Sequence, residues 1–400
     1  MINNNSFKEK IEQLAQKYFD EIVEYRRHLH KHPELSTQEE KTSEFICSKL
    51  EEWGLEFKKN IGGFGIYGFV NGKNPDKKTV ALRADMDALP IKEETELSYK
   101  SINEGVMHAC GHDLHMASLL GAIKILKELE NDFEGRVMFI FQPSEEMYPG
   151  GAWKMLQEGI FKEITPSNIF AFHSTPEMEC GYIGMTEGKA MASTDEIYID
   201  IIGRGGHGAT PELNIDPILV ASHVVVALQS IVSRSATATI PTVFSIGKFI
   251  ANGRTNIIPD SVHLEGIIRT FDENWRKECH NLIERIATQT AKAFGAEAKV
   301  FVDHGYPFVY NDIDLTRKVF GYAQTYFGEE KVLNIPQRTT AEDFSYFSQQ
   351  APSCYFRVGT KKKDMQITNL HTSTFVIDEQ SIKKAMGFSA FLAISSLNQS

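Results

Sequence analysis

The sequence of 400 residues lacks the features that mark several classes of protein. No apolar run reaches the roughly 18 residues that a membrane span needs, and the opening residues MINNNSFKEK contain no apolar signal-peptide core. The five cysteines are scattered and form no CxxC pair, which favours a reducing cytoplasm over a disulfide framework. We therefore expect a cytoplasmic protein without a membrane partner.

Positive charge and nucleotide-binding motifs are also scarce. The formal net charge is −11 at pH 7, whereas nucleic-acid binding requires basic patches. The only basic run, Lys361–Lys363, is short and typical of a solvated loop. Gly63, Gly65 and Gly68 match GxGxxG, but this fingerprint has to open a helix and here it leads into a strand pattern. No Walker-type GK[ST] occurs either, so we expect no nucleic-acid partner.

Length and periodicity predict a two-domain α/β protein. A single core rarely fills 400 residues. Strand and helix patterns alternate in the first half of the chain, with strands at 79–83, 136–141 and 168–172 and helices at about 114–130 and 150–158. This alternation predicts a mixed, largely parallel sheet flanked by helices.

The pattern changes near residue 185 to a β-α-β-β-α-β order, which is typical of a small α+β, ferredoxin-like sandwich. Its expected elements lie at 196–202, 216–234, 242–250, 261–269, 273–294 and 298–303. Helix, strand and loop patterns of the first kind then resume. We predict that a larger domain, residues 1–184 and 305–400, is interrupted by a smaller domain at 185–304.

The densest chemistry lies in residues 107–115, which hold one thiol, three imidazoles and one carboxylate. Gly111 stands between Cys110 and His112, where a tight turn would let both side chains reach the same ions. Thiolate and imidazole are common ligands of zinc and similar ions. We interpret this stretch as a loop that holds a pair of divalent metal ions.

Other polar clusters follow strands of the predicted sheet, where α/β proteins gather their ligands. Asp85 and Asp87 follow one strand, the pair Glu145–Glu146 follows another, and His173 follows a third. His371 also follows an apolar run. One glutamate of an adjacent pair can bind metal while the other takes a proton from water. Taken singly, each residue fits a solvated or core position, but together they favour one site.

Nine segments, spread in order over most of the chain, resemble the metal-dependent aminoacylase and carboxypeptidase family. The closest branch is that of the amidohydrolases of N-acyl amino acids, such as hippurate hydrolases, indole-acetyl-amino-acid hydrolases and N-acetyl-diaminopimelate deacetylases. The segments are RADMDALP (83–90), MHACGHDLH (107–115), FQPSEE (141–146), the strand before His173, GRGGHGATPE (203–212), NIIPD (256–260), GIIRT (266–270), AEDFSYF (341–347) and NLHTSTF (369–375).

The resemblance implies a binuclear site with Glu145 as general base. The implied metal ligands are Cys110, in the bridging place, with His112, Glu146, His173 and His371. Zinc or manganese is the expected metal, and cobalt or nickel also suits these donors. The chain departs from the wider family at its first motif.

At that first motif the wider family has His-x-Asp. One alignment places Asp85 and Asp87 there, and another places Arg83 and Asp85 there. We favour Asp85 as a functional carboxylate and keep both alignments. The missing histidine is consistent with His112 serving instead, which leaves the metal preference open.

For the inserted domain the resemblance implies a lid and a homodimer contact. His207 matches a histidine that in relatives reaches across the dimer to the substrate carbonyl. Asn256 and Arg269 match positions that bind the substrate carboxylate. In the metal loop of the larger domain, we expect His108, Asp113 and His115 to orient the ligand rings by hydrogen bonds, although His115, on the first helical turn, fits a surface or cap residue equally well.

We thus predict hydrolysis of N-acyl-L-amino acids to a carboxylate and a free amino acid. The main alternative is a dipeptidase or carboxypeptidase that uses the same site. A non-catalytic metal-binding protein would be expected to lack Glu145 or a ligand, and this chain lacks neither. A cysteine hydrolase with Cys110 as nucleophile predicts activity without metal.

Overall fold

A computed structural model describes residues 4–364 and 366–398, and their contacts divide the chain into two units. Unit 1 comprises Met1–Ala190, Tyr310–Pro336 and Asp343–Ser400, and unit 2 comprises Met191–Val309 and Gln337–Glu342. The predicted insert did not include Gln337–Glu342, because this short segment is remote in sequence from the rest of unit 2.

Unit 1 is built on an eight-stranded mixed sheet of order β1-β2-β4-β3-β5-β16-β6-β15. Its four neighbouring strands β4, β3, β5 and β16 are parallel, whereas β1, β2 and β6 join in antiparallel pairs. The strands are β1 (Phe57–Ile61), β2 (Gly65–Asn71), β3 (Thr79–Asp85), β4 (Arg136–Gln142), β5 (Asn168–Glu179), β6 (Ile183–Met185), β15 (Val332–Asn334) and β16 (Ser353–Lys361). The predicted mixed, largely parallel sheet is confirmed.

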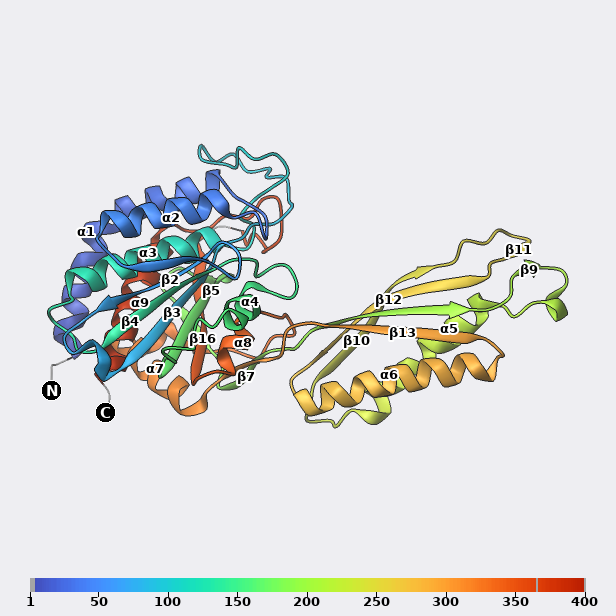
Figure 1. Ribbon diagram of the computed structural model, residues 1–400. Coiled ribbons are helices and arrows are strands. Elements are labelled where there is room, and N and C mark those ends of the chain that lie inside the picture. The colour runs from blue at the N-terminus through green and yellow to red at the C-terminus, as the bar shows by residue number, and fades with distance from the viewer. Residues whose placement is uncertain (1–3, 365, 399–400) are drawn as a thin grey trace. The chain divides into compact units, whose positions relative to one another are not determined.

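Helices cover both faces of this sheet (Figure 1). Along β3, Val80, Leu82 and Ala84 join a core shared with α1, α3 and α9, whereas Arg83 faces Phe344 of α8. This alternation places an apolar layer on one face and polar groups on the other. The helices are α1 (Asn4–Lys31), α2 (Glu40–Glu52), α3 (His112–Glu128), α4 (Gly151–Gln157), α7 (Ile313–Phe327), α8 (Phe344–Ser348) and α9 (Gln380–Leu397).

Unit 2 has an antiparallel four-stranded sheet of order β10-β12-β8-β13, against which α5 and α6 pack. The β-α-β-β-α-β order along the chain is the predicted one. Strands β9 and β11 form a separate two-stranded ribbon. The elements are β8 (Asp195–Ile202), β9 (Gly206–His207), α5 (Pro217–Leu228), β10 (Thr242–Ile250), β11 (Ile257–Ile258), β12 (Ser261–Thr270), α6 (Glu273–Ala293) and β13 (Glu297–His304); β7 (Gly188–Met191) and β14 (Val309–Asn311) form a separate ladder.

The segment Pro217–Ser235 is long and apolar enough to cross a membrane by length and composition alone. The predicted single helix is in fact α5 followed by a π-helical turn at Ile231–Ser235. Val220 and Val224 of α5 are fully buried in the core of unit 2. The apolar composition is therefore explained in part by packing on the sheet.

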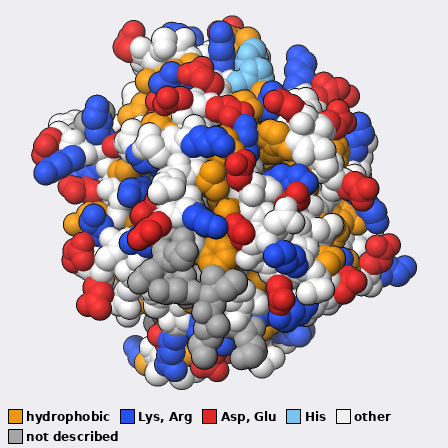
Figure 2. Space-filling view, turned by 90° about the vertical axis from the view of Figure 1, so that its left-hand side faces the viewer, with side chains coloured by type: hydrophobic (Ala, Val, Ile, Leu, Met, Phe, Trp, Pro, Cys, Tyr) orange, Lys and Arg blue, Asp and Glu red, His pale blue; other side chains and the backbone are white. Residues whose placement is uncertain are grey.

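Acidic and basic side chains are interspersed on the described part of the face in Figure 2. A mixed surface of this kind is ordinary for a protein of net negative charge.

Candidate metal centre

The predicted donors of unit 1 lie close together near the carboxyl ends of β3 and β4 and beside β5. Asp85 ends β3, Glu145 and Glu146 follow β4, and His173 lies on β5. The sequence placed His173 after the end of its strand, which is wrong. β5 runs on to Glu179 because β16 continues to pair with it to that point.

Gly111 makes the tight turn between Cys110 and His112. Its φ is +89°, in the region that favours glycine. A Cβ atom there would also lie 2.6 Å from Oγ of Ser174, so any larger residue would push the turn away from β5. Helix α3 begins at His112, two residues earlier than predicted, and both side chains flanking the glycine are buried.

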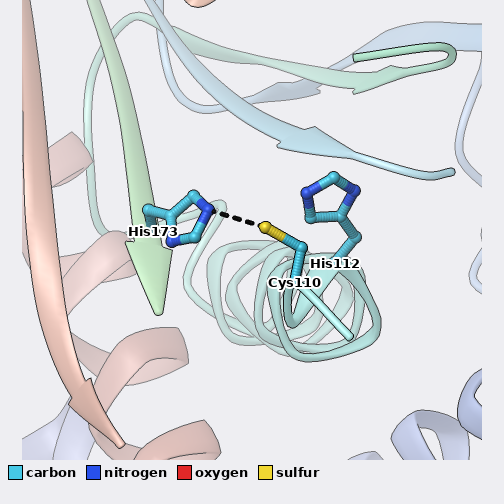
Figure 3. A group of neighbouring side chains, drawn as sticks. All are labelled: Cys110, His112 and His173. Atoms are coloured by element: carbon cyan, nitrogen blue, oxygen red, sulfur yellow. Dashed lines mark hydrogen bonds between the residues drawn. The ribbon is translucent and has the colours of Figure 1, made fainter. Parts of the chain in front are cut away.

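Cys110, His112 and His173 form the first donor group, and their ligand atoms lie within 4.8 Å of one another. Figure 3 shows the Cys110 thiol between the two imidazoles, with its Sγ 3.2 Å from Nε2 of His173. His112 Nδ1 lies 2.8 Å from the carbonyl oxygen of Asp87, and His173 Nδ1 lies 2.7 Å from that of Ser174. Because a carbonyl only accepts, each Nδ1 carries a proton, and in the neutral ring each Nε2 keeps a lone pair that a metal can use.

Cys110 also belongs to a second donor group, with Glu146 and His371. Nε2 of His371 lies 3.3 Å from Cys110 Sγ and 3.4 Å from Glu146 Oε1. The backbone N–H of His371 donates to the carbonyl of Ala109, which ties this segment to the metal loop. Glu145 stands beside this group, because its carboxylate, a ring nitrogen of His112 and the carboxylate of Glu146 place ligand atoms within 4.8 Å of one another.

The charges of the donor set suit divalent cations. Burial, with a contribution from Glu146, raises the pKa of the Cys110 thiol. Hydrogen bonds to Cys110 and Glu146 raise the pKa of His371 to about 10. Burial lowers the pKa of His112, but Asp85 and Asp87 outweigh it and raise that pKa overall. Without metal, protons on the imidazoles balance the negative charges of the thiolate and carboxylate groups. A divalent cation would replace these protons.

Asp87 holds several of these residues in place. It is fully buried, and its Oδ1 and Oδ2 accept from the backbone N–H groups of Glu145 (3.0 Å) and Glu146 (2.9 Å). Its Oδ1 also lies 3.4 Å from Nδ1 of His112. Asp85 is equally buried, but its oxygens accept from Arg83 and His115 instead. Asp87 therefore holds the backbone of Glu145 and Glu146 directly, whereas Asp85 reaches the donors only at His112, with its Oδ1 3.8 Å from Nδ1.

Ser36 and Glu39 support this arrangement, although their spacing suggests a helix capping box. The capping prediction is wrong, since the residue before α2 makes no side-chain cap bond. Ser36 Oγ donates to Asp87 at 2.6 Å, and Glu39 accepts from the N–H and Oγ of Ser144, just before Glu145. The sequence did not predict this supporting role, because a helix cap and a polar support for a loop use the same residue types.

Asp113 and His108, both predicted orienting residues, differ in their contacts. Asp113 lies 2.7 Å from Nε of Arg26 and 2.8 Å from Nδ1 of His30, so it ties the start of α3 to α1. His108 is buried without a hydrogen-bond partner, and burial lowers its pKa to about 3.

A further group of metal-binding residue types, Asp195, His280 and His304, lies in unit 2. Arg276 and His280 already donate to both oxygens of Asp195. Although burial opposes them, these bonds lower the pKa of Asp195 to about 2. We do not count this group as a metal site, because a cation would have to displace the arginine.

The predicted residues of unit 2 fall into two places. His207 lies on the β9–β11 ribbon opposite Ile257, and the N–H of its neighbour Gly208 donates to the carbonyl of Asn256. Arg269 lies near the other end of β12, opposite Val243. Eight residue steps from Ser261 to Arg269 span about 26 Å of extended strand. Unit 2 therefore brings His207 and Asn256 together but holds Arg269 apart.

Comparison with known proteins identifies the family. Residues 81–394 match the model of peptidase family M20/M25/M40. The chain is 42% identical over 305 residues to an N-acyl-L-amino acid amidohydrolase from Geobacillus stearothermophilus, covering 76% of this chain and 81% of the relative. It is 36% identical to thermostable carboxypeptidase 1 from Saccharolobus solfataricus, covering 98% of this chain and 99% of the relative.

A solved structure agrees with these relatives. The crystal structure of a dinuclear metal-binding peptidase of the M20 family from Bacillus subtilis superposes with a TM-score of 0.82 at 32% identity, covering 96% of this chain and 99% of that one. The chain therefore belongs to peptidase family M20/M25/M40, and it is a hydrolase of the amidohydrolase and peptidase type. The predicted family and enzyme class are confirmed.

Proposed function

We propose that this enzyme binds two divalent metal ions and hydrolyses N-acyl-L-amino acids. The observation that carries the proposal is the position of Cys110, whose Sγ belongs to two separate donor groups at once. Cys110 would hold the ions together with His112, His173, Glu146 and His371, which supply the thiolate, imidazole and carboxylate donors that divalent metals prefer. Thiolate and imidazole favour zinc, while the carboxylates also suit manganese, cobalt or nickel.

In this mechanism Glu145 moves the proton. Bound metal ions would polarise the amide carbonyl and lower the pKa of water toward about 7. Glu145 accepts the proton of the attacking water and delivers it to the leaving nitrogen. Asp87 fixes the backbone of Glu145 and Glu146 through two hydrogen bonds, so the proton acceptor and the neighbouring metal ligand keep their spacing. The products are a carboxylate and a free amino acid.

Unit 2 supplies contacts to the substrate in this proposal. The N–H of Ala209 donates to Nδ1 of His207 at 3.0 Å. A neutral His207 ring therefore carries its proton on Nε2, where it can donate to the oxyanion that develops from the amide carbonyl. Arg269 provides a bidentate partner for the substrate carboxylate, with Asn256 as a second donor.

The spacing within unit 2 supports a homodimer. The ribbon with His207 pairs at Ile257 and Ile258, just before β12, and Arg269 lies about 26 Å of strand beyond Ser261, so we infer that one copy does not bring both to one small substrate. We propose that the β9–β11 ribbon of one copy reaches the site of a second copy, whose own chain supplies Arg269. A two-fold dimer would complete two such sites at once.

A carboxypeptidase or dipeptidase activity is the second candidate. The relative named thermostable carboxypeptidase 1, which aligns over nearly the whole chain, favours it. The same metals and the same Glu145 would act on a peptide bond, so the difference lies in the acyl side of the substrate.

The test is hydrolysis of acetyl-, benzoyl- and indole-acetyl-amino acids alongside dipeptides, by native, chelated and metal-reloaded enzyme. We expect activity on the acyl-amino acids that is lost on chelation and restored by zinc or manganese. Faster cleavage of dipeptides would select the second candidate. Full activity in verified metal-free enzyme would refute both and identify Cys110 as a nucleophile.

A further inference from the structure

A side chain of α3 fills a gap in the sheet beside the metal donors. Strands β3 and β5 pair only as far as Arg83 and Ala171, whereas β5 continues to Glu179. Beyond Ala171, no strand among the described residues pairs with the edge of β5 that faces β3. There the N–H of Ser174 donates to Nε2 of His115 at 2.9 Å, so an imidazole takes the place of a strand.

The two bonds of His115 define its protonation. Nε2 must be unprotonated, because the Ser174 N–H can only donate. The proton therefore lies on Nδ1, which donates to Oδ1 of Asp85 at 2.6 Å. Both ring nitrogens are used, so His115 is not available as a metal ligand even though it lies near His112. The ring is a fixed link between a carboxylate and the backbone of β5.

A fully buried ion-pair network holds Asp85 in the form that accepts this bond. Arg83 donates to Oδ2 of Asp85 at 2.7 Å and to Asp343 at 2.9 Å. Gln142 donates to both oxygens of Asp343 and accepts from Nε of Arg83. Buried charges are stable only when they are paired and hydrogen-bonded in this way.

Ser174, at the other end of the link, contacts two metal donors. Its carbonyl oxygen accepts from Nδ1 of His173 at 2.7 Å, and its Oγ donates to the carbonyl of Cys110 at 2.8 Å. The position of this one residue therefore sets both the His173 ring and the backbone of the metal loop. A shift of Ser174 would move the thiol and the imidazole relative to each other.

We propose that His115 is a positioning residue for the reaction, held by Asp85, and that it fixes Ser174 and through it the metal ligands His173 and Cys110. This role rests on the proposed function, because it assumes that these two side chains bind metal. Neither Asp85 nor His115 then touches substrate. Replacement of either side chain weakens metal binding and distorts the geometry of the metal site. It removes no direct contact to the substrate.

The experiment compares three variants by cobalt binding. In His115→Gln, a neutral amide offers one donor for Asp85 and one acceptor for Ser174. In His115→Leu, a side chain of similar size offers neither. Ser118→Ala is the matched control, because Ser118 is buried one turn further along α3 and its Oγ has no hydrogen-bond partner. Cobalt affinity, the cobalt–thiolate absorption band and far-UV circular dichroism are measured for each.

We expect His115→Leu to lose about 10- to 100-fold in cobalt affinity with an altered thiolate band. His115→Gln should stay within about 10-fold of the wild type in cobalt affinity and keep the band, and Ser118→Ala should match it. Unchanged affinity and spectrum in folded His115→Leu would overturn the proposal, as would equal losses in the Gln and Leu variants. If His115→Leu does not fold, Asp85→Asn replaces it, and normal cobalt binding by folded Asp85→Asn would overturn the proposal.

The cobalt measurements separate this inference from the proposed function, because they need no substrate. Wild-type enzyme that binds cobalt normally but hydrolyses no acyl-amino acid would refute the proposed substrate, and the variants would still test His115. Wild-type activity with unaffected His115→Leu would refute only the positioning role.

Discussion

The donor group of Cys110, His112 and His173 in unit 1 and the ribbon of unit 2 hold functional side chains in opposite ways. In unit 1, Cys110, His112 and His173 are buried, and each imidazole is fixed by a hydrogen bond to a backbone carbonyl. In unit 2, His207 and Asn256 are exposed, and the ribbon that carries them pairs through only two residues on each strand.

This difference in burial suggests that unit 1 holds side chains already positioned for the reaction, whereas the ribbon of unit 2 serves recognition. Buried side chains with fixed tautomers cost little reorganisation when they meet a metal or a developing charge. Exposed side chains on a short ribbon gain the same effect only when another surface covers them. We therefore expect changes in unit 1 to act within one subunit, and changes at the ribbon to act on a neighbouring one.

Glu145→Gln should produce the largest loss. The amide keeps the size of Glu145 but cannot accept and return a proton, so we expect kcat to fall by roughly 10²- to 10⁴-fold. Metal content, measured by elemental analysis, should stay at the wild-type level, because the metal ligands on either side of the site are intact. Activity close to that of the wild type would remove Glu145 from its role as general base.

His207→Ala should cost roughly 10²- to 10³-fold in kcat, the usual effect of losing one donor to an oxyanion. Metal binding should not change, because His207 belongs to unit 2 and the metal ligands belong to unit 1. Steady-state kinetics with an acyl-amino acid, together with cobalt titration, would measure both effects.

Mixing the two inactive variants sharpens the comparison. If His207 serves the neighbouring copy, a mixed dimer contains one site with both an intact Glu145 and an intact His207. Random exchange of subunits should then restore about one quarter of the wild-type rate, because half of the dimers are mixed and each has one complete site. Failure to restore activity after proven exchange would place His207 in the site of its own chain.

Periodicity predicted the fold well, and the structure brings the residues proposed as donors close to one another. The mixed sheet follows from the alternation of apolar strands with helices, and the metal loop is recognisable because its donors are adjacent in sequence. His173 and His371 were candidates because each follows an apolar run, but a lone histidine has no local signal that separates a ligand from a core residue, so their assignment as ligands came from the resemblance.

The supporting contacts could not be read from the sequence. Asp343 meets Arg83 across 260 positions of sequence, and neither residue type indicates which partner it will find. Ser36 and Glu39 carried a misleading signal, because a capping box and a polar support for a loop have the same composition. Long-range polar contacts follow from the tertiary packing of the strands, which local patterns do not encode.

Glu39 provides the smallest and most specific prediction, a pH dependence of stability. Burial and the nearby Asp87 raise the pKa of Glu39 from 4.5 to about 7 in the folded protein. Between those values the folded state binds a proton that the unfolded state does not, so stability falls as the pH rises from about 4.5 to about 7. A shift of this size corresponds to a loss on the order of 3 kcal/mol at most.

Glu39→Gln should abolish this contribution, because the amide mimics the protonated acid and its oxygen can still accept from Ser144. Urea unfolding of both proteins at pH 5 and pH 8 measures the effect, and the difference between them cancels the other titrating groups. We expect the variant to gain more stability over the wild type at pH 8 than at pH 5, where the wild type has lost only part of this contribution. The same difference at both pH values would show that Glu39 is already ionised in the fold. The backbone of Ser144, next to Glu145, would then be held by a charged carboxylate.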